Sequence, residues 1–183
     1  MPNASFRSEN QTGATGVVLR DHEGRWCGAW AKRYEHCLNA LTTEAMACRD
    51  GMQYALKRGV EYLQLETDCK VLVSLWEKST FQNSEIGPLL QQINDLSRSF
   101  VEIDLFFSNR SCNRLAHECV KLVSCTRSVE EWLIPPLALQ EIMYADCNHV
   151  HDTWMKLRFV LKKKMFDDRK ETSEKENKER TCR

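Results

Sequence analysis

Residues 41–68 read LTTEAMACRDGMQYALKRGVEYLQLETD, and this stretch decides the fold class. Apolar or small residues recur close to every 3.6 positions from Leu41 to Arg58, which predicts a helix. The run from Tyr62 to Asp68 predicts a buried strand that ends on a carboxylate. Glu44 stands near the start of the helix, so the two elements can bring two distant acids, Glu44 and Asp68, together. Carboxylate pairs of this kind hold hard cations such as Mg²⁺ for phosphate chemistry.

The flanking sequence continues an alternation of helices and strands. A hairpin is predicted before the helix, because two apolar runs flank the turn residues Asp21 to Gly24. The predicted elements, in order, are the hairpin 15–32, the helix 41–58, the strand 61–67, the helices 69–78 and 88–99, the strand 101–108 and the helix 113–126. This order is typical of an α/β layered domain.

The chain changes character after this domain. Pro135–Pro136 is expected to end the compact region, residues 137–144 fit one more helix, and residues 151–161 are weakly amphipathic. Almost no apolar residue follows Phe166, and a segment of that composition cannot bury enough surface to offset its ordering entropy. We therefore expect a domain at 3–126, a C-terminal extension at 127–161 and a charged, disordered tail at 162–183.

The overall composition excludes some classes of protein. The 183 residues carry 26 basic and 26 acidic side chains, so the formal net charge is zero and any nucleic-acid contact must come from a local patch. The nine cysteines form no regular framework, and the N-terminus has no apolar core of signal-peptide length. We expect reduced thiols, a cytoplasmic or nuclear location and no membrane partner, because no run approaches the roughly 20 apolar residues of a membrane span.

Five short segments occur in an order that resembles a known family. They are Gly16–Asp21 with Gly24, Thr43–Ala45 with Ala47, Arg49 and Gly51, Glu66–Asp68, Asn113–His117 with Lys121, and Trp132 with Pro135–Pro136. Together they resemble the ribonuclease H domain, and more narrowly its plant, retroelement-derived, reverse-transcriptase-associated group. The resemblance implies a three-layer α/β fold with a mixed central sheet.

The resemblance also implies a set of site residues. In the family, four acidic groups hold two Mg²⁺ ions, or Mn²⁺, at the scissile phosphate of the RNA strand. Glu44 and Asp68 match two of these positions as metal ligands. The first acidic position falls at Asn3, whose amide offers one neutral oxygen and no charge, and the fourth falls at His117. Imidazole suits Mg²⁺ poorly, because this ion prefers oxygen.

The first strand of the family's sheet is expected to be truncated here. In the family this strand lies in the middle of the sheet and runs several residues before the first acid, whereas only Met1 and Pro2 precede Asn3. Its neighbours would be left with unpaired backbone groups. Two explanations follow. The chain is a truncated gene model or a decayed copy of a retroelement, or another segment or another chain supplies the central strand.

Three functions remain open from the sequence. The first is a Mg²⁺-dependent nuclease that cuts RNA in RNA–DNA hybrids, with very weak activity or none because Asn3 lacks the charge of a carboxylate. The second is a module that binds hybrid or another nucleic acid, or a protein, without cutting. The third is a non-functional retroelement remnant. Ordinary structural roles compete for each residue: a helix-start acid for Glu44, a helix cap for Asp68 and a surface histidine for His117.

Overall fold

The computed structural model describes residues 12–78, 85–109, 113–145 and 155–162, with only the backbone path given for residues 144, 145 and 155–162. Asn3 and residues 163–183 of the predicted tail 162–183 lie outside the described residues, so the predictions on them stay predictions. Lys162, the first residue of that predicted tail, is the last residue of a strand. Within the described ranges, none of the helices has both the length and the apolar content that crossing a bilayer requires.

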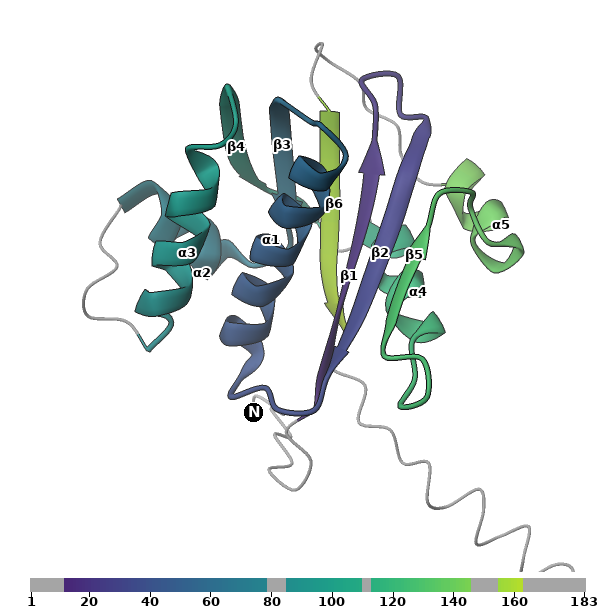
Figure 1. The fold of residues 1–183 in the computed structure, drawn as a ribbon, viewed down its shortest axis with the longest axis horizontal. Coiled ribbons are helices and arrows are strands. Elements are labelled where there is room, and N and C mark those ends of the chain that lie inside the picture. Colours follow the sequence, from purple (N-terminus) through teal and green to yellow (C-terminus); the bar gives the residue numbers. More distant parts are fainter. Residues whose placement is uncertain (1–11, 79–84, 110–112, 146–154, 163–183) are drawn as a thin grey trace, which may run out of the picture.

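Eleven elements make up the described fold (Figure 1). In chain order they are β1 (Gly13–Arg20), β2 (Trp26–Tyr34), α1 (Ala40–Lys57), β3 (Tyr62–Thr67), α2 (Lys70–Lys78), α3 (Gly87–Ser97), β4 (Glu102–Phe107), α4 (Arg114–Leu122), β5 (Val129–Trp132), α5 (Leu137–Ala145) and β6 (Met155–Lys162). The predicted order from the hairpin to α4 is confirmed. The helix predicted to reach residue 126 ends at Leu122, because Val123 is extended with ψ 145°.

The six strands form one mixed sheet in the order β4-β3-β6-β1-β2-β5. β3 pairs in parallel with both β4 and β6, whereas β1 pairs antiparallel with both β6 and β2. β5 pairs antiparallel with β2 and forms the opposite edge of the sheet from β4. The predicted α/β fold with a mixed central sheet is therefore confirmed.

Helices cover both faces of this sheet and give the three layers (Figure 1). Val17 and Leu19 of β1 belong to the core cluster that also contains residues of α1, α3 and β3. Val18, which points to the opposite face, belongs to the second cluster with α4. A Cβ on Gly16 would lie 2.5 Å from the Ala116 carbonyl oxygen, so α4 packs directly on the β1 backbone.

α1 carries the first half of the candidate site, and its ends are defined by local sequence. Asn39 caps the helix, since its side-chain oxygen accepts a hydrogen bond from the Thr42 backbone N–H at 2.8 Å. The sequence pattern alone favours Thr42 or Thr43 as the cap, three or four residues after the observed one. Gly59 follows the helix with φ +73°, the left-handed conformation in which a glycine commonly ends a helix.

The packed region continues beyond Pro135–Pro136, where the sequence analysis expected it to end. Leu139 of α5 is 1% exposed and packs in the α4 cluster. β5 and β6, which also fall in the range 127–161, are both strands of the central sheet. This range contributes to the same sheet and core as the residues before it.

β6 occupies the third position of the six-stranded sheet although it is the last of the described elements in chain order. The resemblance led us to expect a vacancy in the middle of the sheet, filled by another segment if the chain is intact. Residues 155–162 fill that central position, hydrogen-bonded to β1 on one side and to β3 on the other. The weak amphipathic pattern of residues 151–161 did not predict this central position, because strand placement depends on partners far away in the sequence.

Candidate nucleic-acid site at the end of β3

Glu44 lies on α1 where the start of this helix meets the end of β3. Its side chain is 9% exposed, and the Thr67 hydroxyl donates a hydrogen bond to its Oε2 at 3.5 Å. Thr67 is fully buried at the last position of β3. This contact connects the helix and the strand that the sequence analysis expected to meet, and it holds the Glu44 carboxylate in a partly desolvated position.

Asp68 follows Thr67 directly and is partly exposed. The same Thr67 hydroxyl accepts a hydrogen bond from the Cys69 backbone N–H at 3.1 Å, which turns the chain from β3 into α2. Thr67 therefore contacts Glu44 and fixes the turn that carries Asp68. Sequence reasoning missed Thr67, although its position between a buried strand and Asp68 was a usable signal.

His117 lies on α4, which packs against β1, β2 and β6. Its neighbours Leu115 and Ala116 belong to the α4 core cluster, whereas Glu44 lies on α1 beside the other cluster. Among the residues that the structure describes, no three His, Cys, Asp or Glu side chains form a group able to hold a metal ion. The described part of the chain thus leaves Glu44, Asp68 and His117 short of a complete ligand set.

The available ligands limit how many metal ions the site can hold. β6, which lies beside β3, reads MKLRFVLK and contains no acidic residue. Mg²⁺ in proteins is commonly held by one or two carboxylates together with substrate phosphates and water. Glu44 and Asp68 provide two carboxylates, which is less negative charge than two adjacent divalent ions need.

A second buried polar network lies farther along α1 and was not predicted. Asp50, 5% exposed, accepts hydrogen bonds from Thr15 at 3.3 Å, from the Tyr34 hydroxyl, and from Arg49 Nη2 at 2.8 Å. Burial and the adjacent Asp50 carboxylate raise the pKa of Tyr34 above its usual range. All of these groups are satisfied by one another, so the network connects α1 to β1 and β2 and has a structural role.

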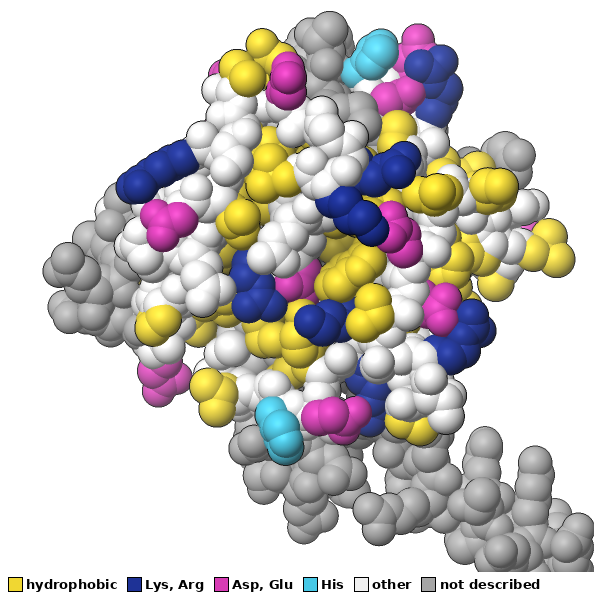
Figure 2. Space-filling view, viewed as in Figure 1, with side chains coloured by type: hydrophobic (Ala, Val, Ile, Leu, Met, Phe, Trp, Pro, Cys, Tyr) yellow, Lys and Arg dark blue, Asp and Glu magenta, His cyan; other side chains and the backbone are white. Residues whose placement is uncertain are grey.

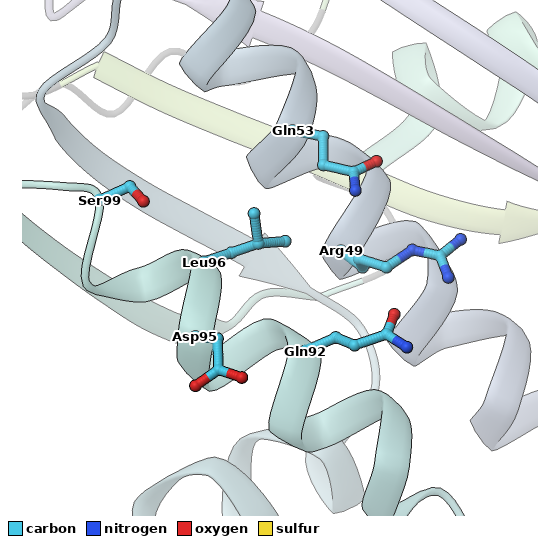
Figure 3. A pocket seen from close by; sticks show the side chains of 6 residues that line it. All are labelled: Arg49, Gln53, Gln92, Asp95, Leu96 and Ser99. Atoms are coloured by element: carbon cyan, nitrogen blue, oxygen red, sulfur yellow. The ribbon is translucent and has the colours of Figure 1, made fainter.

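A polar groove of about 440 Å³ lies between α1 and α3 (Figure 3). It is lined by Arg49, Gln53, Gln92, Asp95, Leu96 and Ser99. Its charged groups are of opposite sign, and the Arg49 guanidinium is already paired with Asp50. We assign no ligand to this groove.

Cations are dispersed over the surface. Figure 2 shows Lys and Arg side chains interspersed with Asp and Glu over the visible face. Several are paired, including Lys57 with Glu131 and Arg127 with Glu130. Near the candidate site, the Lys70 ammonium lies 4.7 Å from the centre of the Phe107 ring, where α2 begins and β4 ends. Lys70 is two residues from Asp68 and is the nearest lysine to it in the sequence.

Comparison with known proteins decides the family. The reverse transcriptase-like family matches residues 1–123, which is more than half of the chain. The chain belongs to the reverse transcriptase-like family. Its fold is ribonuclease H-like, and this part of the prediction is confirmed. No curated protein matches the sequence.

Two solved structures resemble this reverse transcriptase-like domain. The RNase H1 of the halophilic archaeon Halobacterium salinarum matches with a TM-score of 0.55 and 16% identity, over 64% of this chain and 89% of that one. The N-terminal RNase H domain of a Mycobacterium tuberculosis protein, solved as a fusion with maltose binding protein, matches with a TM-score of 0.42 and 16% identity, over 58% and 88%. At 16% identity, the match to the Halobacterium salinarum enzyme is evidence of the fold alone.

Proposed function

We propose that this chain is a ribonuclease H-type domain that binds RNA–DNA hybrid, or a related nucleic acid, and hydrolyses the RNA strand slowly or not at all. The observation that carries the proposal is the position of Glu44 and Asp68 around Thr67, at the junction of α1 and β3. The family and the ribonuclease H-like fold support a nucleic-acid substrate.

The metal ligands proposed are Glu44 and Asp68, with Asn3 as a neutral, weakened ligand and His117 as the substitute at the fourth position. A bound Mg²⁺ or Mn²⁺ would supply Lewis-acid polarisation of the phosphate and an activated water. The buried Glu44 carboxylate would be held in place by the Thr67 hydroxyl. Asp68, which is partly exposed, would offer the second carboxylate.

Slow hydrolysis follows from the charges available. A two-metal mechanism needs enough negative charge to hold two divalent ions about 3.5–4 Å apart. Two carboxylates, with an amide at Asn3 and imidazole at His117, provide less charge than four acids. β6 adds no carboxylate beside β3. We therefore propose that nucleic-acid binding is less impaired than hydrolysis of the RNA strand.

Binding without cutting would depend on the shape of the nucleic acid. Hybrid recognition of this kind reads groove geometry, 2′-hydroxyls and phosphates rather than base edges. With a formal net charge of zero, the attraction must come from local cations such as Lys70. The proposal implies moderate affinity and a shallow salt dependence, because few phosphates are neutralised.

The proposal is tested by a cleavage assay on a labelled RNA–DNA hybrid with Mg²⁺ or Mn²⁺, using protein shown to be folded by circular dichroism. The matched control is the double variant Glu44→Gln, Asp68→Asn, which keeps side-chain size and removes both charges. We expect slow cleavage that disappears in the control, or none in either protein. Fast cleavage that the control abolishes would show that the proposed loss of activity is wrong.

The proposal extends to the origin and the location of the protein. The segments Thr43–Ala45 and Asn113–His117 support a retroelement-derived group, such as that of plants. The six cysteines within the described residues are free thiols, which supports a reducing compartment such as the cytoplasm or nucleus.

A further inference from the structure

β6, the last strand among the described residues, holds the two parts of the sheet together. β1 and β3 do not pair with each other; each pairs with β6. Without β6, the sheet would separate into the pair β4-β3 and the three strands β1-β2-β5. Asp68 follows a strand of the first part, so its placement relative to the rest of the sheet depends on β6.

The gap that β6 fills is specific in its geometry. Residues 156–162 pair antiparallel with β1, from Arg20↔Lys156 to Ala14↔Lys162. Residues 155–158 pair in parallel with Leu63–Glu66 of β3. An occupant must therefore be extended, must run in the direction of β3, and must satisfy backbone groups on both sides.

The same gap is enclosed by helices above and below. Both α1 and α4 contact β6. A central strand between two helix layers is a buried position, so leaving it empty would expose backbone groups and apolar surface from both layers.

We propose that the gap between β1 and β3 is a strand-binding site, filled by the chain's own residues 155–162 and able to accept the same segment as a separate peptide. Recognition is by strand addition, in which main-chain hydrogen bonds supply affinity. The occupant is assigned to residues 155–162 because they hold this position, paired with β1 on one side and with β3 on the other.

Hydrogen exchange on the unmodified full-length chain gives the first test. If residues 155–162 occupy the centre of the sheet, their amides exchange as slowly as those of β1. Exchange at the rate of an unstructured peptide would overturn the proposal. This measurement needs no variant, so it holds whatever the stability of altered proteins.

A variant with a weakened strand gives the second test. Leu157 is the position whose Cα pairs with both Leu19 and Leu65. In the full chain, Leu157→Pro removes a backbone N–H from a central strand, where proline is not accommodated. We expect a lower unfolding midpoint, whereas the control Leu157→Val keeps the N–H and stays close to the original.

Adding the segment as a separate peptide distinguishes a strand-binding site from a segment that only contributes to stability. A synthetic peptide of residues 155–162 is added to the Leu157→Pro chain, and the unfolding midpoint is followed as the peptide is titrated. We expect the midpoint to rise with peptide concentration, since a ligand of the folded state stabilises it by mass action. The same peptide with Leu157→Pro should have no effect. A destabilised chain that ignores the unmodified peptide, or a variant as stable as the original, would overturn the proposal.

Discussion

The Thr67 hydroxyl lies 3.5 Å from a carboxylate oxygen of Glu44, and this contact joins the end of β3 to the start of α1. Both residues are buried, at 0% and 9% exposure. The same hydroxyl accepts the Cys69 N–H and so sets the turn on which Asp68 stands. One threonine thus orders both carboxylates of the candidate site.

Replacing this hydroxyl should affect stability measurably. Thr67→Val keeps the side-chain shape but leaves Glu44 and the Cys69 N–H without this partner. We expect a loss of about 1–2 kcal/mol in the free energy of unfolding, the usual cost of removing one side of a buried hydrogen bond. Denaturant unfolding measures it. Thr126→Val, at an exposed loop position, is the control and should change the free energy by less than about 0.5 kcal/mol. Equal effects of the two substitutions would contradict the role given to Thr67.

Gly28 in β2 should tolerate no side chain. Its φ is +148°, and a Cβ there would clash with the Tyr54 hydroxyl oxygen. We expect Gly28→Ala to cost about 2 kcal/mol from backbone strain alone, with the clash added. Thermal unfolding measures the loss.

Tyr54→Phe separates the clash from the strain. The Tyr54 hydroxyl has no hydrogen-bond partner within the part of the chain that the structure describes, so its removal alone should cost little. In the double variant Gly28→Ala, Tyr54→Phe, part of the lost stability should be recovered. The effects of the two substitutions on the free energy of unfolding should therefore not be additive. Strict additivity would show that the two residues do not meet.

Alkaline pH should unfold the protein partly through Tyr54. Burial, with a smaller effect of Glu131, raises the pKa of Tyr54 to about 12. The pKa in the unfolded chain is about 10, so this contribution to stability is complete below pH about 10 and is lost as pH rises toward 12. The unfolding midpoint should fall over that window, and it should fall less steeply for Tyr54→Phe. Parallel curves for the two proteins would contradict the raised pKa.

Thiol reactivity should divide the cysteines by burial. Burial raises the pKa of Cys48 and of Cys119, which are 1% and 0% exposed, whereas Cys125 is exposed. Because the thiolate is the reactive form, brief labelling of the native protein with iodoacetamide should modify Cys125 and spare the other two. Peptide mass spectrometry reads the sites, and labelling in denaturant should reach all three. Early modification of Cys48 in the native protein would show that its face of α1 is open.

The sequence allowed the local elements and their order to be predicted, but not the central strand. The helix containing Glu44 and the strand before Asp68 follow from strong periodic patterns and clear end signals. Residues 155–162 carry a weak pattern, and their position depends on pairing with β1 and β3, which precede them by more than 80 residues. Long-range pairing of this kind leaves little trace in a local window.

The candidate site shows the same division between local and distant information. Glu44 and Asp68 could be selected because each stands at the end of a recognisable element. Thr67 was overlooked because a threonine in a strand is ordinary, and its contact with Glu44 spans 23 residues. The Asp50 network likewise needs β1, β2 and α1 in place before its partners meet.

The most direct test of the proposed function is a binding titration with three labelled ligands of one sequence: RNA–DNA hybrid, DNA duplex and single-stranded RNA. The protein is the folded full chain without divalent ions, at two salt concentrations. We predict that the hybrid binds most tightly and that its affinity falls modestly at higher salt. Equal failure to bind all three ligands would contradict a nucleic-acid-binding ribonuclease H-type domain.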